Sequence, residues 1–249
     1  MLPRLIVGNW KMHKTVQEAC ELVQAVLAVL KLPQHVEAAV APPFTALHAV
    51  GEVIAGSPLR LAAQNVCWET EGAFTGEISP HMLHALGCQY VIIGHSERRR
   101  LFGETDAMIN KKVKAALQSA LSPILCVGET FEEREAGDTE QIVQRQTVQG
   151  LEGISPEDLQ RVTIAYEPVW AIGTGLAATT TQAEAVHQMI HETLRHRWGE
   201  SGAHVRILYG GSVTPANAPE LFQSAHINGA LVGKACLDPD AFAMIIRTA

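Results

Sequence analysis

Short apolar stretches rich in β-branched residues alternate with longer amphipathic stretches along the whole chain. The short stretches have the length of buried strands, and the longer ones show the three- to four-residue spacing of helices. The predicted strands are residues 4–10, 36–41, 60–64, 89–94, 122–128, 161–167, 205–210 and 229–233. Eight strands separated by helices, in 249 residues, predict an α/β protein with a single (β/α)8 barrel domain over residues 1–249. The alternative is a doubly wound open sheet.

Three of the amphipathic stretches are long enough to be helices on their own. The clearest is 181–198, where apolar residues recur at helical spacing. Thr181 and Glu184 match a capping box, which predicts that this helix starts there. The segments 105–120 and 130–152 are also predicted to be helices.

Polar residues that are unusual beside buried strands follow the strands directly. They are Asn9, Lys11, His95, Glu167, the Gly-Gly-Ser turn at 210–212 and the Gly-Lys turn at 233–234. A closed barrel brings the carboxyl ends of all its strands to one mouth, whereas an open sheet spreads them along an edge. Their clustering at strand ends therefore favours the barrel.

Two glycine-containing turns follow the last two predicted strands, at 209–213 and 231–235. Either one alone is typical of an ordinary tight turn. In barrels, however, the loops after strands seven and eight commonly bind phosphate through backbone N–H groups. The glycines at 173 and 175 lack the third glycine of a dinucleotide fingerprint, so a Rossmann site is not indicated.

Three side chains have the chemistry of an acid–base site, although each also has an ordinary structural role open to it. Glu167 ends a buried strand, His95 begins a predicted helix, and Lys11 lies between large apolar residues. A histidine at a helix N-terminus tends to stay neutral and to donate a hydrogen bond. A carboxylate, a neutral imidazole, a lysine and phosphate-binding turns suit proton abstraction beside the carbonyl of a small phosphorylated compound. Such a site would perform an aldose–ketose isomerisation without a cofactor.

The histidine pairs do not indicate a metal site. His187 and His191 are four residues apart, and His81 and His84 are three apart, but neither pair has a carboxylate that completes a ligand set. We therefore expect no metal and interpret these residues as surface histidines.

Composition narrows the functional classes further. The net charge of −7 and the lack of a basic run argue against nucleic acid as a partner. The longest apolar runs are too short to span a bilayer, and the N-terminus does not have the pattern of a signal peptide. Five scattered cysteines fit reduced thiols, so a cytoplasmic protein is expected.

Seven stretches together resemble one known family over essentially the whole chain. They are "GNWKMH" (8–13), "APPFTAL" (41–47), "AAQNVCWETEGAFTGEIS" (62–79), "IIGHSERR" (92–99), "LCVGE" (125–129), "AYEPVWAIGTG" (165–175) and "YGGSV" (209–213). By these motifs the chain resembles the triosephosphate isomerases. The resemblance implies a cofactor-free interconversion of D-glyceraldehyde 3-phosphate and dihydroxyacetone phosphate through an enediolate, a step of glycolysis and gluconeogenesis.

The resemblance also implies a role for each catalytic residue. Glu167 matches the general base, and His95 matches the neutral electrophile that polarises the carbonyl. Lys11 is similar to the lysine that stabilises the enediolate and attracts the dianion. Asn9 matches part of the surroundings of the developing oxyanion, and Glu97 matches a supporting second carboxylate.

Other matches concern substrate binding and motion. Gly173, Ser212 and the backbone of Gly233 and Lys234 match phosphate contacts, besides Asn9 and Lys11, and residues 168–178 resemble a mobile lid. Lid closure would exclude water from the enediolate.

The loop at 65–79 resembles the one that inserts into a second subunit, where Thr75 reaches the neighbouring site. A homodimer is thus implied. The loop's apolar content agrees, since "CWETEGAFTG" is an oddly apolar segment to leave in water.

The chain departs from the family pattern at three places. Lys234 stands where a second glycine is usual, and a positive φ there would cost on the order of 1 kcal/mol. The rear hinge of the lid, usually Lys-Thr-Ala, is Leu-Ala-Ala at 176–178, which predicts altered opening kinetics. Asn228 replaces the usual aspartate before Gly229, so a carboxylate partner for a basic residue is expected to be missing.

Two other functions stay open from the sequence. One is another phosphosugar isomerase or epimerase, which generally needs metal-ligating residues at strand ends that this chain lacks. The other is a catalytically silent phosphate-binding barrel, for which the replacement at Lys234 is the single supporting feature.

Overall fold

Eight parallel strands close into a barrel in chain order, with β1 paired to both β2 and β8. The structure is a computed structural model and describes residues 3–171 and 178–249. The strands are β1 (Arg4–Asn9), β2 (Val36–Ala41), β3 (Leu59–Ala63), β4 (Cys88–Ile93), β5 (Ser122–Val127), β6 (Thr163–Tyr166), β7 (Arg206–Tyr209) and β8 (Gly229–Val232). The predicted barrel is confirmed, and all eight predicted strands are present.

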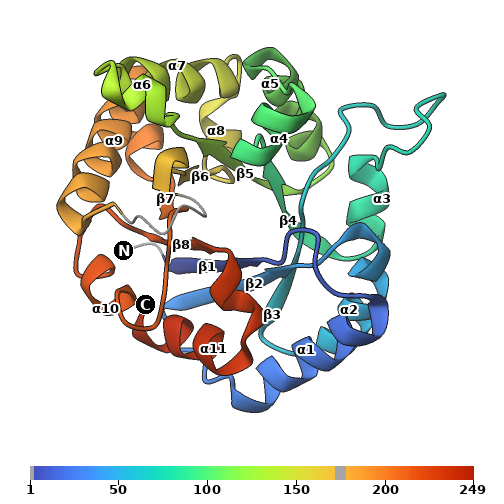
Figure 1. The fold of residues 1–249 in the computed structure, drawn as a ribbon. Coiled ribbons are helices and arrows are strands. Elements are labelled where there is room, and N and C mark those ends of the chain that lie inside the picture. Colours follow the sequence, from blue (N-terminus) through green and yellow to red (C-terminus); the bar gives the residue numbers. More distant parts are fainter. Residues whose placement is uncertain (1–2, 172–177) are drawn as a thin grey trace.

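Helices surround the barrel as an outer ring (Figure 1). The α-helices are α1 (Val16–Val29), α2 (Leu47–Ile54), α3 (Pro80–Ala85), α4 (Ser96–Phe102), α5 (Asp106–Gln118), α6 (Phe131–Glu135), α7 (Thr139–Gly150), α8 (Pro156–Leu159), α9 (Thr180–Ala203), α10 (Ala218–Leu221) and α11 (Pro239–Thr248). Short 3-10 helices are η1 (Phe44–Ala46), η2 (Val169–Ala171) and η3 (Lys234–Leu237). The segment between β3 and α3 extends well beyond this ring (Figure 1).

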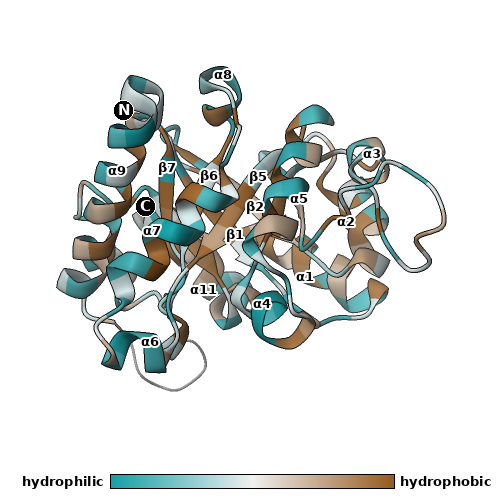
Figure 2. Cartoon of the chain, turned by 90° about the horizontal axis from the view of Figure 1, so that it is seen from above, coloured by the Kyte–Doolittle hydropathy of each residue, from teal (hydrophilic) through white to brown (hydrophobic). Residues whose placement is uncertain are grey.

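The two-residue repeat of the strands divides the core into two parts. In β1, Leu5 and Val7 belong to the cluster inside the barrel, while Ile6 belongs to the cluster between strands and helices. The strands are accordingly hydrophobic and the outer helical faces hydrophilic (Figure 2). Continuing the alternation turns Asn9 inward at the end of β1, and it places Glu167 two residues after the inward Ala165. The same period that builds the core therefore aims polar side chains into the mouth.

Two helix predictions were wrong in detail. The last long helix starts at Thr180, because Thr179 is its N-cap and forms the capping box with Gln182, instead of Thr181 with Glu184. The segment 130–152 is not one helix. Gly137, with φ of 81°, separates α6 from α7, since a left-handed residue ends the first helix.

The interpretation of the i, i+4 histidines as surface residues was also wrong. His187 is fully buried, and His191 is only partly exposed. Both rings contact the carbonyl oxygen of His226, at 3.2 Å from His187 Nδ1 and 3.2 Å from His191 Nε2. These hydrogen bonds connect α9 to the segment that precedes β8.

Asn228 stands where the family pattern has aspartate, and its side chain has a hydrogen-bond partner. Its Oδ1 accepts a hydrogen bond from the backbone N–H of Ile207 at 2.9 Å. The amide therefore ties the entry of β8 to β7.

Candidate active site

Glu167 lies immediately after β6, with only 2% of its surface exposed. Two glycines make room for it. A Cβ on Gly210 would lie 2.9 Å from Cγ of Glu167, and a Cβ on Gly128 would collide with its carbonyl oxygen. Neighbouring strands thus close tightly around this carboxylate, which explains glycine at both positions.

The carboxylate of Glu167 is held by three donors. The backbone N–H of Ser96 donates at 2.9 Å, the hydroxyl of Ser96 at 3.2 Å, and His95 Nε2 lies 3.0 Å away. Burial raises the pKa of Glu167, but the neighbouring His95 and the Ser96 N–H lower it, and the net shift is downward. Glu167 is therefore ionised at neutral pH, as a general base must be.

His95 is the N-cap of α4, where its Nδ1 accepts the backbone N–H of Glu97 at 3.2 Å. A proton on Nδ1 would face that N–H, so the contact selects the neutral ring with its proton on Nε2. Burial lowers the pKa of His95, while the charge of Glu167 raises it, and the net shift is upward. The cause of that upward shift is removed once Glu167 turns to a substrate, leaving a neutral donor.

Lys11 and Glu97 form an ion pair at the mouth of the barrel, with Nζ 2.7 Å from Oε1. The backbone N–H of Lys11 also donates to Oδ1 of Asn9 at 3.0 Å. Lys11 itself adopts φ of 51°, in the left-handed region where a residue with a side chain is uncommon. The structure therefore brings Lys11, Asn9, Glu97, His95 and Glu167 into one continuous network. The strand-end pattern predicted four of them for the mouth, and the family resemblance implied Glu97.

The two predicted phosphate turns lie after β7 and β8. The carbonyl of Ser212 accepts a hydrogen bond from the Asn217 amide at 2.9 Å. Among the residues described, no oxygen accepts a hydrogen bond from the backbone N–H of Ser212 or Gly233. A Cβ built on Gly233 would lie 3.9 Å from Cε of Lys11, so the second turn adjoins the catalytic network.

Lys234 begins η3 and does not have a positive φ. The backbone strain that a positive φ would cause in a lysine at this usual glycine position is therefore absent. Gly173 and the hinge residues 176 and 177 lie outside the described residues, as does most of the predicted lid.

Sequence reasoning missed two residues of the site. Ser96, although inside the quoted motif, was not assigned a role, yet it supplies two of the donors to Glu167. Glu129 is fully buried and accepts hydrogen bonds from Tyr166, Trp170 and Arg134 at about 3 Å. The partners of Glu129 are distant in the sequence or on other elements, so they could not be read from the sequence. Its position directly after a strand and a glycine was nevertheless an available signal.

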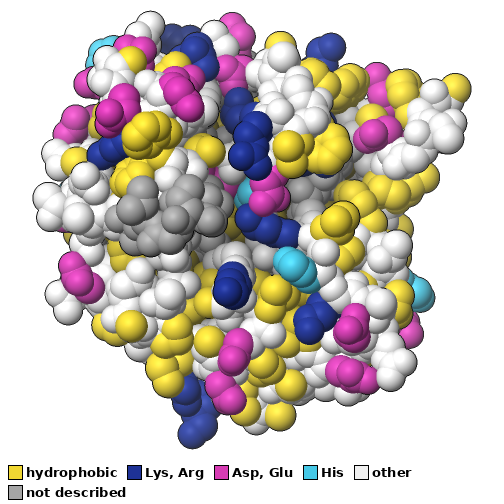
Figure 3. Space-filling view, in the orientation of Figure 1, with side chains coloured by type: hydrophobic (Ala, Val, Ile, Leu, Met, Phe, Trp, Pro, Cys, Tyr) yellow, Lys and Arg dark blue, Asp and Glu magenta, His cyan; other side chains and the backbone are white. Residues whose placement is uncertain are grey.

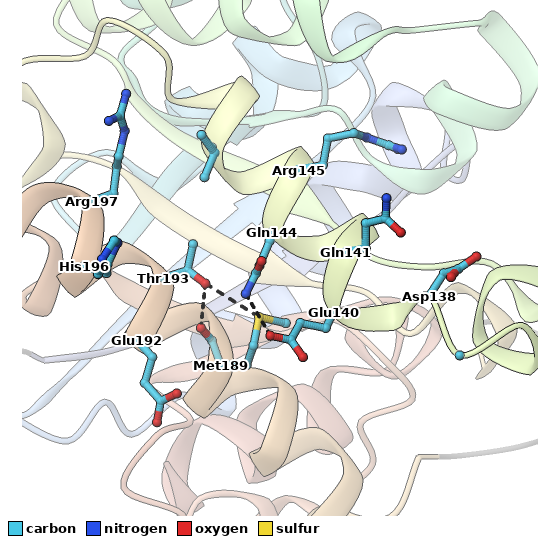
Figure 4. A pocket seen from close by; sticks show the side chains of 12 residues that line it. Asp138, Glu140, Gln141, Gln144, Arg145, Met189, Glu192, Thr193, His196 and Arg197 are labelled. Atoms are coloured by element: carbon cyan, nitrogen blue, oxygen red, sulfur yellow. Dashed lines mark hydrogen bonds between the residues drawn. The ribbon is translucent and has the colours of Figure 1, made fainter.

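The mouth is polar in the space-filling view, where basic, acidic and histidine side chains gather near the middle of the face (Figure 3). A cavity of about 830 Å³ lies elsewhere, on the outside between α7 and α9. Its walls mix both signs of charge, and several of its side chains, such as Arg145 and Arg197, point away from one another (Figure 4). It has no convergent chemistry, so the barrel mouth is the candidate site.

No helix in the part of the chain that the structure describes is long and apolar enough to cross a membrane. No group of three or more histidine, cysteine, aspartate or glutamate residues there has the arrangement of a metal site.

The fold and this network define an α/β-barrel enzyme with an ionised base beside a neutral imidazole and a lysine. A model of the family described as triosephosphate isomerase matches residues 4–249. The chain therefore belongs to the triosephosphate isomerase family and is an isomerase.

Individual relatives agree over the full length. The triosephosphate isomerase of Chlorobium phaeovibrioides is 51% identical and covered completely, as is this chain. That of Chloroflexus aurantiacus is 54% identical, with 98% of each chain covered. The crystal structure of triosephosphate isomerase from Bartonella henselae superposes with a TM-score of 0.89 at 40% identity, covering 99% of each chain.

Proposed function

We propose that the barrel mouth interconverts D-glyceraldehyde 3-phosphate and dihydroxyacetone phosphate, as a step of glycolysis and gluconeogenesis. The observation that carries this proposal is the buried, ionised Glu167 beside the Nε2–H of a neutral His95, 3.0 Å away. Family membership supports the substrate, and the network supports the roles below. The whole chain, residues 1–249, acts as one barrel domain.

Glu167 is the general base. In the described conformation Ser96 and His95 occupy its oxygens, so the carboxylate must turn away from both to reach a substrate carbon. It then removes the proton on the carbon beside the carbonyl, and the electron pair moves onto the carbonyl oxygen to give an enediolate. The proton of the adjacent hydroxyl moves to the former carbonyl oxygen, and the protonated Glu167 returns its proton to the neighbouring carbon as the new carbonyl forms there. The isomerisation is then complete without a cofactor.

His95 and Lys11 stabilise the oxygens on which charge develops. Release of Glu167 frees the Nε2–H of His95 to donate to the carbonyl oxygen, and Nδ1 stays fixed by Glu97 N–H. Lys11 supplies a positive charge, with Glu97 positioning its ammonium at 2.7 Å and Asn9 holding its backbone. Fixed donors of this kind need no reorganisation as charge forms.

The substrate phosphate binds at the turns after β7 and β8. The backbone N–H groups of Ser212 and Gly233 are the donors, with Lys234 beside them. Gly173 is proposed as a further donor from the lid.

The test is the Glu167→Gln variant assayed on glyceraldehyde 3-phosphate. Glutamine keeps the size but cannot accept the proton, so kcat should fall by roughly 1,000-fold or more. Glu157→Gln, a change of the same kind at an exposed position of α8, is the control and should match the wild type. Equal activity in Glu167→Gln and wild type would refute the assigned base. An inactive wild type that still binds phosphate ligands would favour the silent barrel.

The chain is further proposed to act as a homodimer through the 65–79 loop, with Thr75 reaching the partner's site. Phe74 on this loop is 45% exposed, and Met82 on α3 and Phe102 on α4 are 52% and 65% exposed. Apolar side chains line the side of the molecule from which the loop projects (Figure 3). Covering that surface would gain hydrophobic free energy.

The cytoplasm is the proposed compartment. All five cysteines are free, and four of them are buried, which suits a reducing environment.

A further inference from the structure

The rim of the barrel mouth carries a lysine whose side-chain ammonium has no role in the proposed chemistry. Lys234 follows Gly233 directly at the carboxyl end of β8, and its side chain is exposed. Gly233 is close to Lys11, since a Cβ on it would lie 3.9 Å from Cε of Lys11. One peptide unit, about 3.8 Å between Cα atoms, separates Gly233 from Lys234. Lys234 therefore stands on the same rim as the catalytic lysine.

The catalytic network alone has more negative than positive charge, which is unfavourable for attracting a dianion. Lys11 is bound to Glu97 at 2.7 Å, and Glu167 is ionised, so one cation faces two carboxylates. The chain as a whole also has a net charge of −7. An approaching phosphate dianion thus meets an unfavourable field unless a further cation acts at the rim.

Two other cations near the mouth are already engaged. Arg98 and Arg99 of α4 are paired with Glu104 and Asp106, both at 2.5 Å. Lys234, by contrast, forms no ion pair with a carboxylate of the described residues. No neighbouring carboxylate among the described residues therefore neutralises the charge of Lys234. Its backbone belongs to η3, where the Cys236 N–H donates to the Gly233 carbonyl at 2.9 Å.

We propose that Lys234 is an electrostatic capture residue for the phosphate dianion of the substrate. A lysine ammonium is a compact charge on a flexible stem, suited to attracting a phosphate from solution rather than fixing its orientation. Lys234 offsets the second carboxylate of the catalytic network and guides the dianion to the N–H groups after β7 and β8. This role rests on the proposed function, because it requires a phosphorylated substrate.

The experiment measures kcat/KM for glyceraldehyde 3-phosphate against salt concentration in wild type, Lys234→Gln and Lys234→Arg. At about 0.01 M salt, where the Debye length is about 30 Å, Lys234→Gln should lower kcat/KM by about three- to tenfold. At about 1 M salt the difference should disappear, because screening then acts within about 3 Å. Lys234→Arg, which keeps the charge, should retain the salt dependence of the wild type.

Two controls separate steering from other effects. Lys31→Gln makes the same change of net charge between α1 and β2, at the opposite end of the barrel, and should leave the salt dependence unchanged. Unphosphorylated glyceraldehyde should react equally in wild type and Lys234→Gln, because it lacks the dianion. An active wild type with the same salt dependence as Lys234→Gln would overturn this inference alone. A wild type inactive on the phosphorylated substrate would overturn the proposed function and this inference with it.

Discussion

At the scale of single residues, His187 shows how a buried neutral group couples stability to pH. Burial lowers the pKa of His187 to about 3, while its Nδ1–H donates to the His226 carbonyl at 3.2 Å. In the unfolded chain a histidine titrates near 6.5. As pH falls below that value the unfolded state takes up the proton first, so acid favours unfolding through this group.

The expected result is a loss of about 1.4 kcal/mol of unfolding free energy per pH unit from His187 between about pH 6 and pH 4. His187→Asn keeps a donor near His226 but cannot titrate, so its stability should fall less steeply with acid, whatever its stability at pH 7. Urea unfolding at several pH values measures both slopes. His48→Asn, an exposed change on α2, is the control. Parallel slopes for wild type and His187→Asn would contradict the prediction.

Residue-level reasoning from the sequence found the position of a polar side chain where it directly follows a strand, while the catalytic roles stay predictions. Glu167, His95 and Lys11 are recognisable because the strand period points such positions into the mouth. It failed where partnership depends on elements far apart in sequence. The local sequence around His187 and His191 does not differ from that of a histidine pair on a solvated helix face. What distinguishes them is their contact with the carbonyl of His226, which lies 35 or more residues away in the sequence.

At the scale of elements, a buried ionic cluster joins α5 to the segments around α4 and the projecting loop. Lys112 of α5 donates to Glu104 and, at 2.8 Å, to Oδ1 of Asn65. The side chains of Glu104 and Lys112 are only 2% and 4% exposed. Arg98 completes the cluster from α4. Removing Lys112 or Arg98 would leave the buried carboxylate of Glu104 with one positive partner fewer.

Lys112→Met should therefore lower the unfolding free energy by about 3 kcal/mol, since breaking a buried ion pair strands its partner. Lys114→Met, on the same helix but without an ion-pair partner among the described residues, should change the unfolding free energy by about 0.5 kcal/mol or less. Chemical denaturation of both variants measures the difference. A Lys112→Met protein as stable as the Lys114→Met protein would show that the cluster contributes little net stability.

Element boundaries were less predictable than element types. All eight strands were found because buried parallel strands form continuous apolar runs. The start of α9 was misplaced by one residue, since three consecutive threonines at 179–181 offer several capping registers and only backbone geometry selects Thr179 with Gln182. Gly137 was an available signal for the break between α6 and α7, but surrounding helix formers masked it.

At the scale of the whole molecule, the barrel carries the polar mouth, and the loop at 65–79 is the surface through which we propose that two copies assemble. Cys67 anchors the loop, since it is buried and its N–H donates to the Ile78 carbonyl at 2.8 Å. Phe74 at the far part of the loop is exposed. A loop tied at its base with an apolar tip is suited to insertion into a second copy.

Phe74→Asp tests that assembly, because a carboxylate there would be desolvated in an interface but solvated on a monomer. Wild type should sediment at about twice the mass of one 26.9 kDa chain, and Phe74→Asp at about one. If Thr75 of the partner completes the site, monomers should lose activity by at least about 100-fold, the cost of a misplaced catalytic group. Met244→Asp, on α11 away from the loop, should stay dimeric and active. A fully active Phe74→Asp monomer would separate catalysis from assembly, and a monomeric wild type would remove the dimer altogether.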